Sequence, residues 1–182
     1  DLAAEAIRLP RQLTTLVDDP EVIGLLALML LHHARRDSRT RPDGSIVALA
    51  EQDRERWDRR LIGEGIEAIQ TALARDRLGE YQAQAAIAAL HADAPRVEDT
   101  DWVQIVEWYD ELLRFADTPI VRINSAVAVC AADGAPARAV DRRGGARLGH
   151  SGGPCQPAGA THAPSGDHRQ RQIEAEHLID LG

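Results

Sequence analysis

Apolar residues recur at steps of three and four along most of the first 134 positions, the spacing that places side chains on one face of an α-helix. The stripe is clearest in the segment that begins at Trp102. Residues 37–50 instead hold a Pro-Asp-Gly turn signal and a short apolar run, which we expect to be either an extended stretch or a lead-in to the next helix. The pattern predicts helices over residues 2–16, 20–36, 53–75, 79–93, 102–113 and 119–134.

Prolines and acidic residues indicate where some of these helices begin. Pro10 lies inside the first segment, so that helix is expected either to kink there or to start near Leu9. Pro20 suits a first helical turn, and Asp18 and Asp19 before it offer an N-cap. Short connections between the segments favour antiparallel helical pairs.

The aromatic content, 3%, is low for a chain in which 44% of residues are hydrophobic. A core with so few Phe, Tyr and Trp residues must be built from Ala, Leu, Ile and Val, which suits closely packed helices better than a β-sandwich. We therefore expect an all-α fold of about six helices over residues 1–132, with the rest of the chain forming a separate tail.

The net charge of -8 argues against a surface that binds nucleic acid. Residues 1–132 hold 15 Arg against 23 Asp and Glu, which gives 15 - 23 = -8 for this region. The longest apolar run, residues 22–31, is too short to span a bilayer. Two cysteines and the lack of a signal sequence predict a cytoplasmic protein without a disulfide framework. Since the chain begins at Asp1 within a predicted helix, we expect it to be a fragment.

The composition changes after residue 133, where nine of the 14 glycines and four of the nine prolines occur. Residues 133–182 are expected to be mostly disordered, with a short helix over 167–181. An out-of-frame reading of a GC-rich gene is our hypothesis for this stretch. With no further helical pair after residue 134, one apolar helix face is expected to stay exposed and to promote self-association. Its residues are Ile120, Ile123, Val127 and Cys130.

Six segments resemble, in order, the C-terminal tetratricopeptide-like domain of a group of bacterial extracytoplasmic-function (sigma-70 type) sigma factors. They read AEAIRLPRQL, DDPEVIGLLALMLLHHARR, EQDRERWDRRLIGEG, YQAQAAIAALHADAP, EDTDW and PIVRINSAVAV. The resemblance implies an accessory or regulatory domain that acts in transcription initiation by contacting RNA polymerase core or the sigma regions of its parent protein. The promoter-binding regions are absent from this chain, and Pro10 and the tail depart from the family pattern. The alternative is a stand-alone helical-repeat adaptor.

Two polar clusters are the candidate binding positions, and both also have a structural interpretation. Asp99, Thr100, Asp101 and Trp102 combine a carboxylate pair with a tryptophan, but a helix N-cap followed by a core residue explains them better than acid-base or metal chemistry. The second cluster, Asp53, Arg54 and Trp57, is interpreted in the same way, as a helix start with a salt bridge and a core anchor.

Asn124 is a further candidate, expected to bond a neighbouring backbone group. No phosphate-binding loop, nucleophile elbow or compact set of metal ligands occurs. The sequence thus predicts a protein that is not an enzyme and that needs no metal or cofactor.

Overall fold

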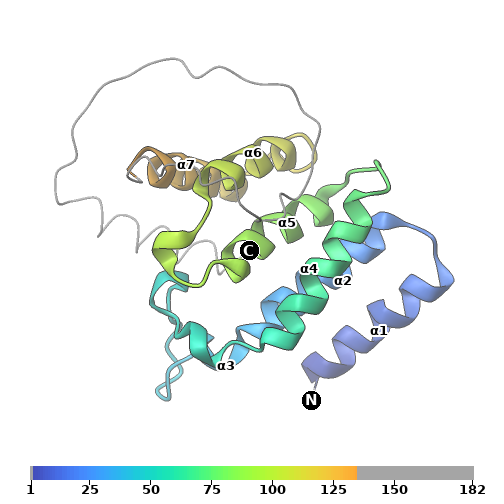
Figure 1. Cartoon of the computed structure of the whole chain (residues 1–182), viewed down its shortest axis with the longest axis horizontal. Helices are drawn as coiled ribbons and strands as arrows, with labels where there is room; N and C mark the ends of the chain where they lie inside the picture. The colour runs from blue at the N-terminus through green and yellow to red at the C-terminus, as the bar shows by residue number, and fades with distance from the viewer. Residues whose placement is uncertain (1, 135–182) are drawn as a thin grey trace.

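The computed structural model describes residues 2–134, and every regular element in this range is helical (Figure 1). The only strand-like feature in the range is an isolated antiparallel bridge from Thr40 to Ile46, around the predicted Pro-Asp-Gly turn. The all-α prediction is therefore confirmed for these residues, whereas the predictions for the tail and its helix lie outside them. The helices are α1 (Leu2–Leu16), α2 (Pro20–Ala34), α3 (Arg36–Arg39), α4 (Arg59–Leu73), α5 (Glu80–Asp93), α6 (Trp102–Leu113) and α7 (Pro119–Gly134), with 3-10 turns η1 (Leu49–Glu51), η2 (Arg54–Arg56) and η3 (Val97–Asp99).

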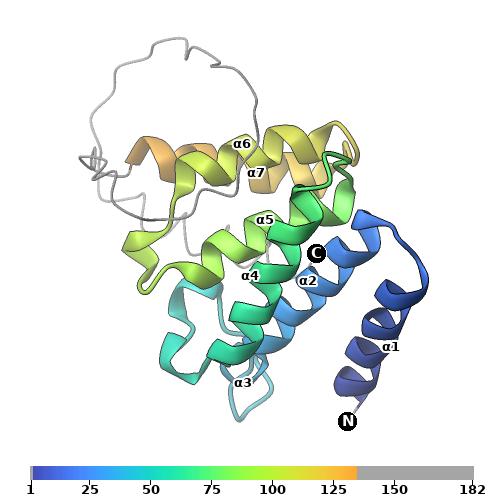
Figure 2. The same ribbon diagram turned by 45° about the vertical axis from the view of Figure 1, so that its right-hand side comes forward.

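Helix α2 lies between neighbours, as its apolar sequence predicts. It packs against α1, α4 and α5. Helix α5 also packs against α6, and α6 packs against α7. Figures 1 and 2 both show α6 and α7 side by side at one end of the structure and α1 at the other. Helix α5 therefore connects the α1–α4 part to the α6–α7 pair.

The core is built largely from small and aliphatic side chains, as the low aromatic content predicts. Four alanines in the middle of α5 are at most 2% exposed, so α2, α4 and α6 can approach its backbone closely. The three tryptophans of the chain are all buried. These alanines are Ala83, Ala85, Ala86 and Ala89.

The first helix does not begin near Leu9, because α1 runs continuously from Leu2 and includes Pro10. Proline cannot donate a backbone hydrogen bond, and inside a helix this leaves the carbonyl four residues earlier without its partner. That residue is Ala6, which is exposed, so water can bind its carbonyl. Tertiary packing tolerates the proline here, since Pro10 itself is buried.

The predicted helix over residues 53–75 starts too early, since α4 begins only at Arg59. The Asp58 carboxylate accepts hydrogen bonds from the backbone amides of Arg60 (3.0 Å) and Leu61 (3.1 Å), which makes Asp58 the N-cap. Asp53 caps the separate 3-10 turn η2 by accepting from the Glu55 amide at 3.0 Å. Helix α2 likewise ends at Ala34, two residues before its predicted end, and the short α3 follows.

Candidate functional site

Arg54 places a buried guanidinium at the C-terminal end of α5. The η2 turn positions it, and only 8% of the residue is exposed. Its Nη1 donates hydrogen bonds to the carbonyl oxygens of His91 (2.6 Å) and Ala94 (2.9 Å). Carbonyls at a helix C-terminus lack partners within the helix and carry partial negative charge. Arg54 therefore caps α5 from a segment 37 residues earlier in the chain.

Trp57 supports the Arg54 guanidinium, whose carbon lies 4.5 Å from the centre of the Trp57 ring. The indole is 3% exposed, and its Nε1 donates to the Ser38 hydroxyl at 2.8 Å. The Ser38 hydroxyl in turn donates to the Arg35 carbonyl at 3.0 Å. The Asp53, Arg54 and Trp57 cluster is thus a buried connection between the end of α2 and the end of α5, and Asp53 is the exposed cap at its edge.

The cluster that ends at Trp102 meets the Arg54 cluster through His91. The rings of His91 and Trp102 are in an edge-on arrangement, with centroids 5.2 Å apart and planes at 77°. Trp102 opens α6 and is 7% exposed. The structure therefore brings Arg54, Trp57 and Trp102 together around the last turn of α5, although they are far apart in the sequence.

The polar residues before Trp102 have separate local roles. Asp101 is the N-cap of α6 and accepts a hydrogen bond from the Gln104 amide at 3.0 Å. Asp99 forms an ion pair with Arg96 at 2.9 Å. Thr100 is 7% exposed, and its Oγ1 has no hydrogen-bond partner among residues 2–134. The predicted cap is confirmed for Asp101, and the two carboxylates are engaged with the protein itself.

Asn124 lies on α7 and is 7% exposed, apart from both clusters in the sequence. Its side-chain oxygen Oδ1 is buried without a hydrogen-bond partner within the described part of the chain. This oxygen therefore does not accept a hydrogen bond from a neighbouring backbone group within residues 2–134.

Glu21 holds the other end of α5. Its carboxylate accepts from the Tyr81 amide at 2.5 Å, from the Gln82 amide at 3.3 Å and from the Gln82 side-chain nitrogen at 3.1 Å. A Cβ on Gly79 would lie 2.4 Å from a Glu21 carboxylate oxygen, so a larger residue at the start of α5 would have to displace the Glu21 side chain. Helix α5 thus has a carboxylate at its positive end and a guanidinium at its negative end, both supplied by earlier segments.

The sequence gives little indication of the role of Glu21. Its position in the first turn of α2 predicts only a favourable contact with the dipole of that helix, whereas the residues it binds lie about 60 positions later. Gly79 followed by the Ala-rich segment was the available signal, because no Ser, Thr, Asp or Asn directly precedes this helix to cap it.

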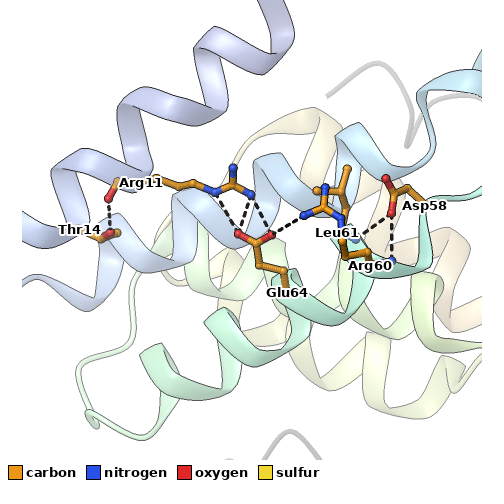
Figure 3. A network of polar contacts seen from close by, with 6 residues as sticks. All are labelled: Arg11, Thr14, Asp58, Arg60, Leu61 and Glu64. Carbon is orange, nitrogen blue, oxygen red and sulfur yellow. Dashed lines mark hydrogen bonds and ion pairs between the residues drawn. The ribbon is translucent and has the colours of Figure 1, made fainter.

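A cavity of about 220 Å³ lies at the surface between α1, the end of α2 and the start of α4. Beside it, the Arg11 guanidinium binds both carboxylate oxygens of Glu64 at 2.6 and 2.8 Å (Figure 3). Arg60 also approaches Glu64, at 4.0 Å. These arginines already have a carboxylate partner. The cavity is lined by Ile7, Arg11, His33, Ala34, Arg36, Asp37, Asp58, Arg60 and Leu61.

Within residues 2–134, no three or more His, Cys, Asp or Glu side chains gather in a way that could hold a metal ion. None of the helices described is both long and apolar enough to cross a membrane. The residues of the two clusters serve contacts between helices, and their carboxylates cap helix or 3-10 turns or, for Asp99, pair with Arg96. The arrangement is suited to fixing the relative positions of helices.

Comparison with known proteins gives two matches. Residues 1–73 match a family of unknown function (DUF6596). An uncharacterized protein of Rhizobium meliloti (strain 1021) is 47% identical over 135 residues, which cover 74% of this chain and 32% of that protein. The chain thus spans about a third of the length of this relative. No solved structure matches.

The buried His91 predicts a dependence of stability on pH. Burial, followed by the charges of Arg35 and Arg54, lowers the pKa of His91 from 6.5 to about 3. The folded protein keeps this imidazole neutral, whereas the unfolded chain binds a proton near pH 6.5. Above pH 6.5 neither state binds this proton, and stability does not depend on it. Below pH 6.5 the unfolded chain is favoured by proton binding, so the free energy of unfolding falls by about 1.4 kcal/mol per pH unit until the pH reaches about 3.

Urea unfolding between pH 7.5 and 5 measures this effect. As the pH is lowered, we expect the free energy of unfolding of the native chain to decrease. The decrease should be smaller in His91→Leu, although that variant is less stable at pH 7.5. Equal slopes for the two proteins would contradict a neutral, buried His91.

Proposed function

We propose that this chain is the C-terminal accessory domain of an extracytoplasmic-function sigma factor and acts in transcription initiation through protein contacts. The support is the ordered set of six segments that resemble this domain. Three of them supply the residues that bind or flank α5, and a fourth forms α5 itself. In this proposal the two polar clusters maintain the scaffold, and partners bind its outer surface. The role is one of binding rather than catalysis, in the cytoplasm where RNA polymerase acts.

A tetratricopeptide-like arrangement of the helices is part of the proposal. Helices α4 and α5 form one antiparallel pair, and α6 and α7 form the next (Figure 2). Helix α4 packs against α5, α5 against α6, and α6 against α7. Contacts of this sequential kind are the basis of helical-repeat proteins, in which each pair covers the apolar face of its neighbour.

The outer face of α1 is the proposed binding surface for the partner. Leu9, Leu13 and Leu16 are 56%, 40% and 80% exposed, while Ile7 and Pro10 point into the protein. Three exposed leucines along one helix are typical of a protein-binding surface. In the family that the chain resembles, this domain follows the sigma regions, so α1 would be the helix nearest to them. We therefore assign this face to the sigma regions of the parent protein.

The coding sequence upstream of Asp1 is the first test, and we expect in-frame sigma regions there. A start codon immediately before Asp1, with no sigma regions, would favour the stand-alone adaptor. Leu13→Glu in this chain should weaken its binding to the separately expressed sigma regions of the parent protein by about tenfold, which corresponds to about 1.4 kcal/mol. The matched control is Val103→Glu on α6, which introduces the same charge at an exposed apolar position and should change binding less than about twofold. If Leu13→Glu still bound the sigma regions but no longer bound polymerase core, the α1 face would instead be the contact with the polymerase.

A further inference from the structure

Helix α7 carries an exposed apolar surface that no helix of residues 2–134 covers. We define the α7 stripe as Ile120, Ile123, Val127 and Cys130. Ile120 and Ile123 are 53% and 46% exposed, Cys130 is exposed, and Val127 is half-buried. The helix packs on α6 through a different face, formed by Asn124, Ala128 and Ala131.

The charge of α7 favours another copy of this chain as the partner. The chain as a whole carries 29 acidic residues and a net charge of -8, so two copies repel each other over most of their surfaces. The 16 residues of α7 include only Arg122 and Asp133 as charged groups, and Arg122 pairs with Asp117 at 2.5 Å. Residues 118–132 hold no carboxylate, so the stripes of two copies can meet without bringing carboxylates together. At the ends of an antiparallel pair Asp133 lies opposite Asp117, whose charge is offset by its ion pair with Arg122. A nucleic acid or a strongly charged protein finds no complementary charge there.

The spacing of the α7 stripe is self-complementary. Its steps along the chain are three, four and three, so the stripe has the same pattern in both directions. Side chains at such spacing lie on one helix face. In an antiparallel pair of α7 helices, Ile120 faces Cys130 of the other copy, and Ile123 faces Val127. The exposed Ala126 beside the stripe leaves room for the two backbones to approach.

We propose that two copies of the chain form a two-fold symmetric dimer through antiparallel α7 helices. The parallel arrangement is disfavoured because it places Arg122 beside Arg122 and Asp133 beside Asp133. A two-fold axis uses the same patch on both copies, which a self-complementary stripe satisfies. This inference is independent of the role in transcription.

The small size of the surface sets the expected affinity. The α7 stripe extends over ten residues, or about 15 Å of helix, so it buries less than the roughly 800 Å² per partner of a standard interface. We therefore expect a reversible dimer with a dissociation constant of about 10 to 100 μM.

Sedimentation equilibrium of the full chain from about 5 to 300 μM tests the dimer. The native chain should change from monomer to dimer over this range, and Ile123→Glu should raise the dissociation constant at least tenfold. Val103→Glu on α6 is the control and should dimerise as the native chain does, with circular dichroism showing that both variants are folded. A native chain that stays monomeric throughout would overturn the proposal. Dimers that survive Ile123→Glu, or that Leu13→Glu on α1 disrupts equally, would also overturn it.

Disulfide cross-linking tests the antiparallel orientation. In a Cys155→Ser background, Cys130 is the only cysteine, and adding Ile120→Cys places a thiol opposite it on the other copy. With an added mild oxidant we expect rapid covalent dimers from this variant, and slow or no dimers from the Cys155→Ser chain itself or from Val103→Cys in the same background. Efficient Cys130 to Cys130 cross-linking in the Cys155→Ser chain would instead indicate a parallel pair and contradict the proposed geometry.

Discussion

Replacing Arg54 with Ala is expected to lower the free energy of unfolding by about 3 kcal/mol. The substitution removes two hydrogen bonds to the carbonyls of His91 and Ala94 and the stacking on Trp57. It also leaves both carbonyls at a buried helix end, where an unsatisfied polar group is more costly than a lost surface contact. Arg54→Lys should recover little, because an ammonium cannot reproduce the planar guanidinium that stacks and bonds at once.

Chemical denaturation at pH 7.5 provides the measurement, with Arg56→Ala as the matched control. Arg56 is in the same turn but is exposed, so its removal should change stability by less than about 0.5 kcal/mol. If the two alanine variants were equally stable, the bonds from Arg54 to the C-terminal end of α5 would contribute nothing to the stability of the protein.

Replacing Gly24 with Ala is expected to destabilise the protein by about 2 to 3 kcal/mol. Gly24 is the point at which α2 crosses the start of α5, and an added Cβ would lie 2.8 Å from the Gln82 backbone nitrogen and 3.0 Å from its Cα. Backbone atoms cannot rotate away as a side chain can, so the two helices must move apart. The contacts of Glu21 with the first turn of α5 would be disturbed as well.

Gly63→Ala is the internal control for this prediction. Gly63 is also within a helix, but a Cβ there meets no atom within 4 Å. Since Ala has a higher helix propensity, this variant should gain about 0.5 to 1 kcal/mol. Thermal and urea unfolding of the two variants should therefore give changes of opposite sign. A loss of stability in both would show that helix contact does not determine the effect at Gly24.

The periodicity of apolar residues predicts most of the helices because it depends on positions close together in the sequence. The starts of α2, α5, α6 and α7 agree with the prediction for this reason. The start of α4 does not, since Asp53 and Asp58 can each act as a helix cap, and spacing alone does not distinguish a 3-10 turn from the first turn of a helix.

The long-range contacts of the candidate site could not be predicted in this way. Arg54 is recognisable as one of a cluster, but its acceptors are backbone carbonyls 37 and 40 positions later, and any residue type supplies a carbonyl. The contact of Glu21 with α5 is hidden for the same reason, because it binds backbone amides about 60 positions away. A pattern of side chains contains no information about such partners until the helices are placed.

The closure of α5 at both ends by other segments affects how this helix can move. Isolated helices fray from their termini, where amides and carbonyls lack partners. In α5 the first amides are bound by Glu21 and the last carbonyls by Arg54. The first turn can therefore open only if Glu21 at the start of α2 releases it, and the last turn only if Arg54 in η2 releases it. Local opening of α5 is thereby coupled to the release of α2 and η2, and we expect the amide protons of this helix to exchange slowly with solvent.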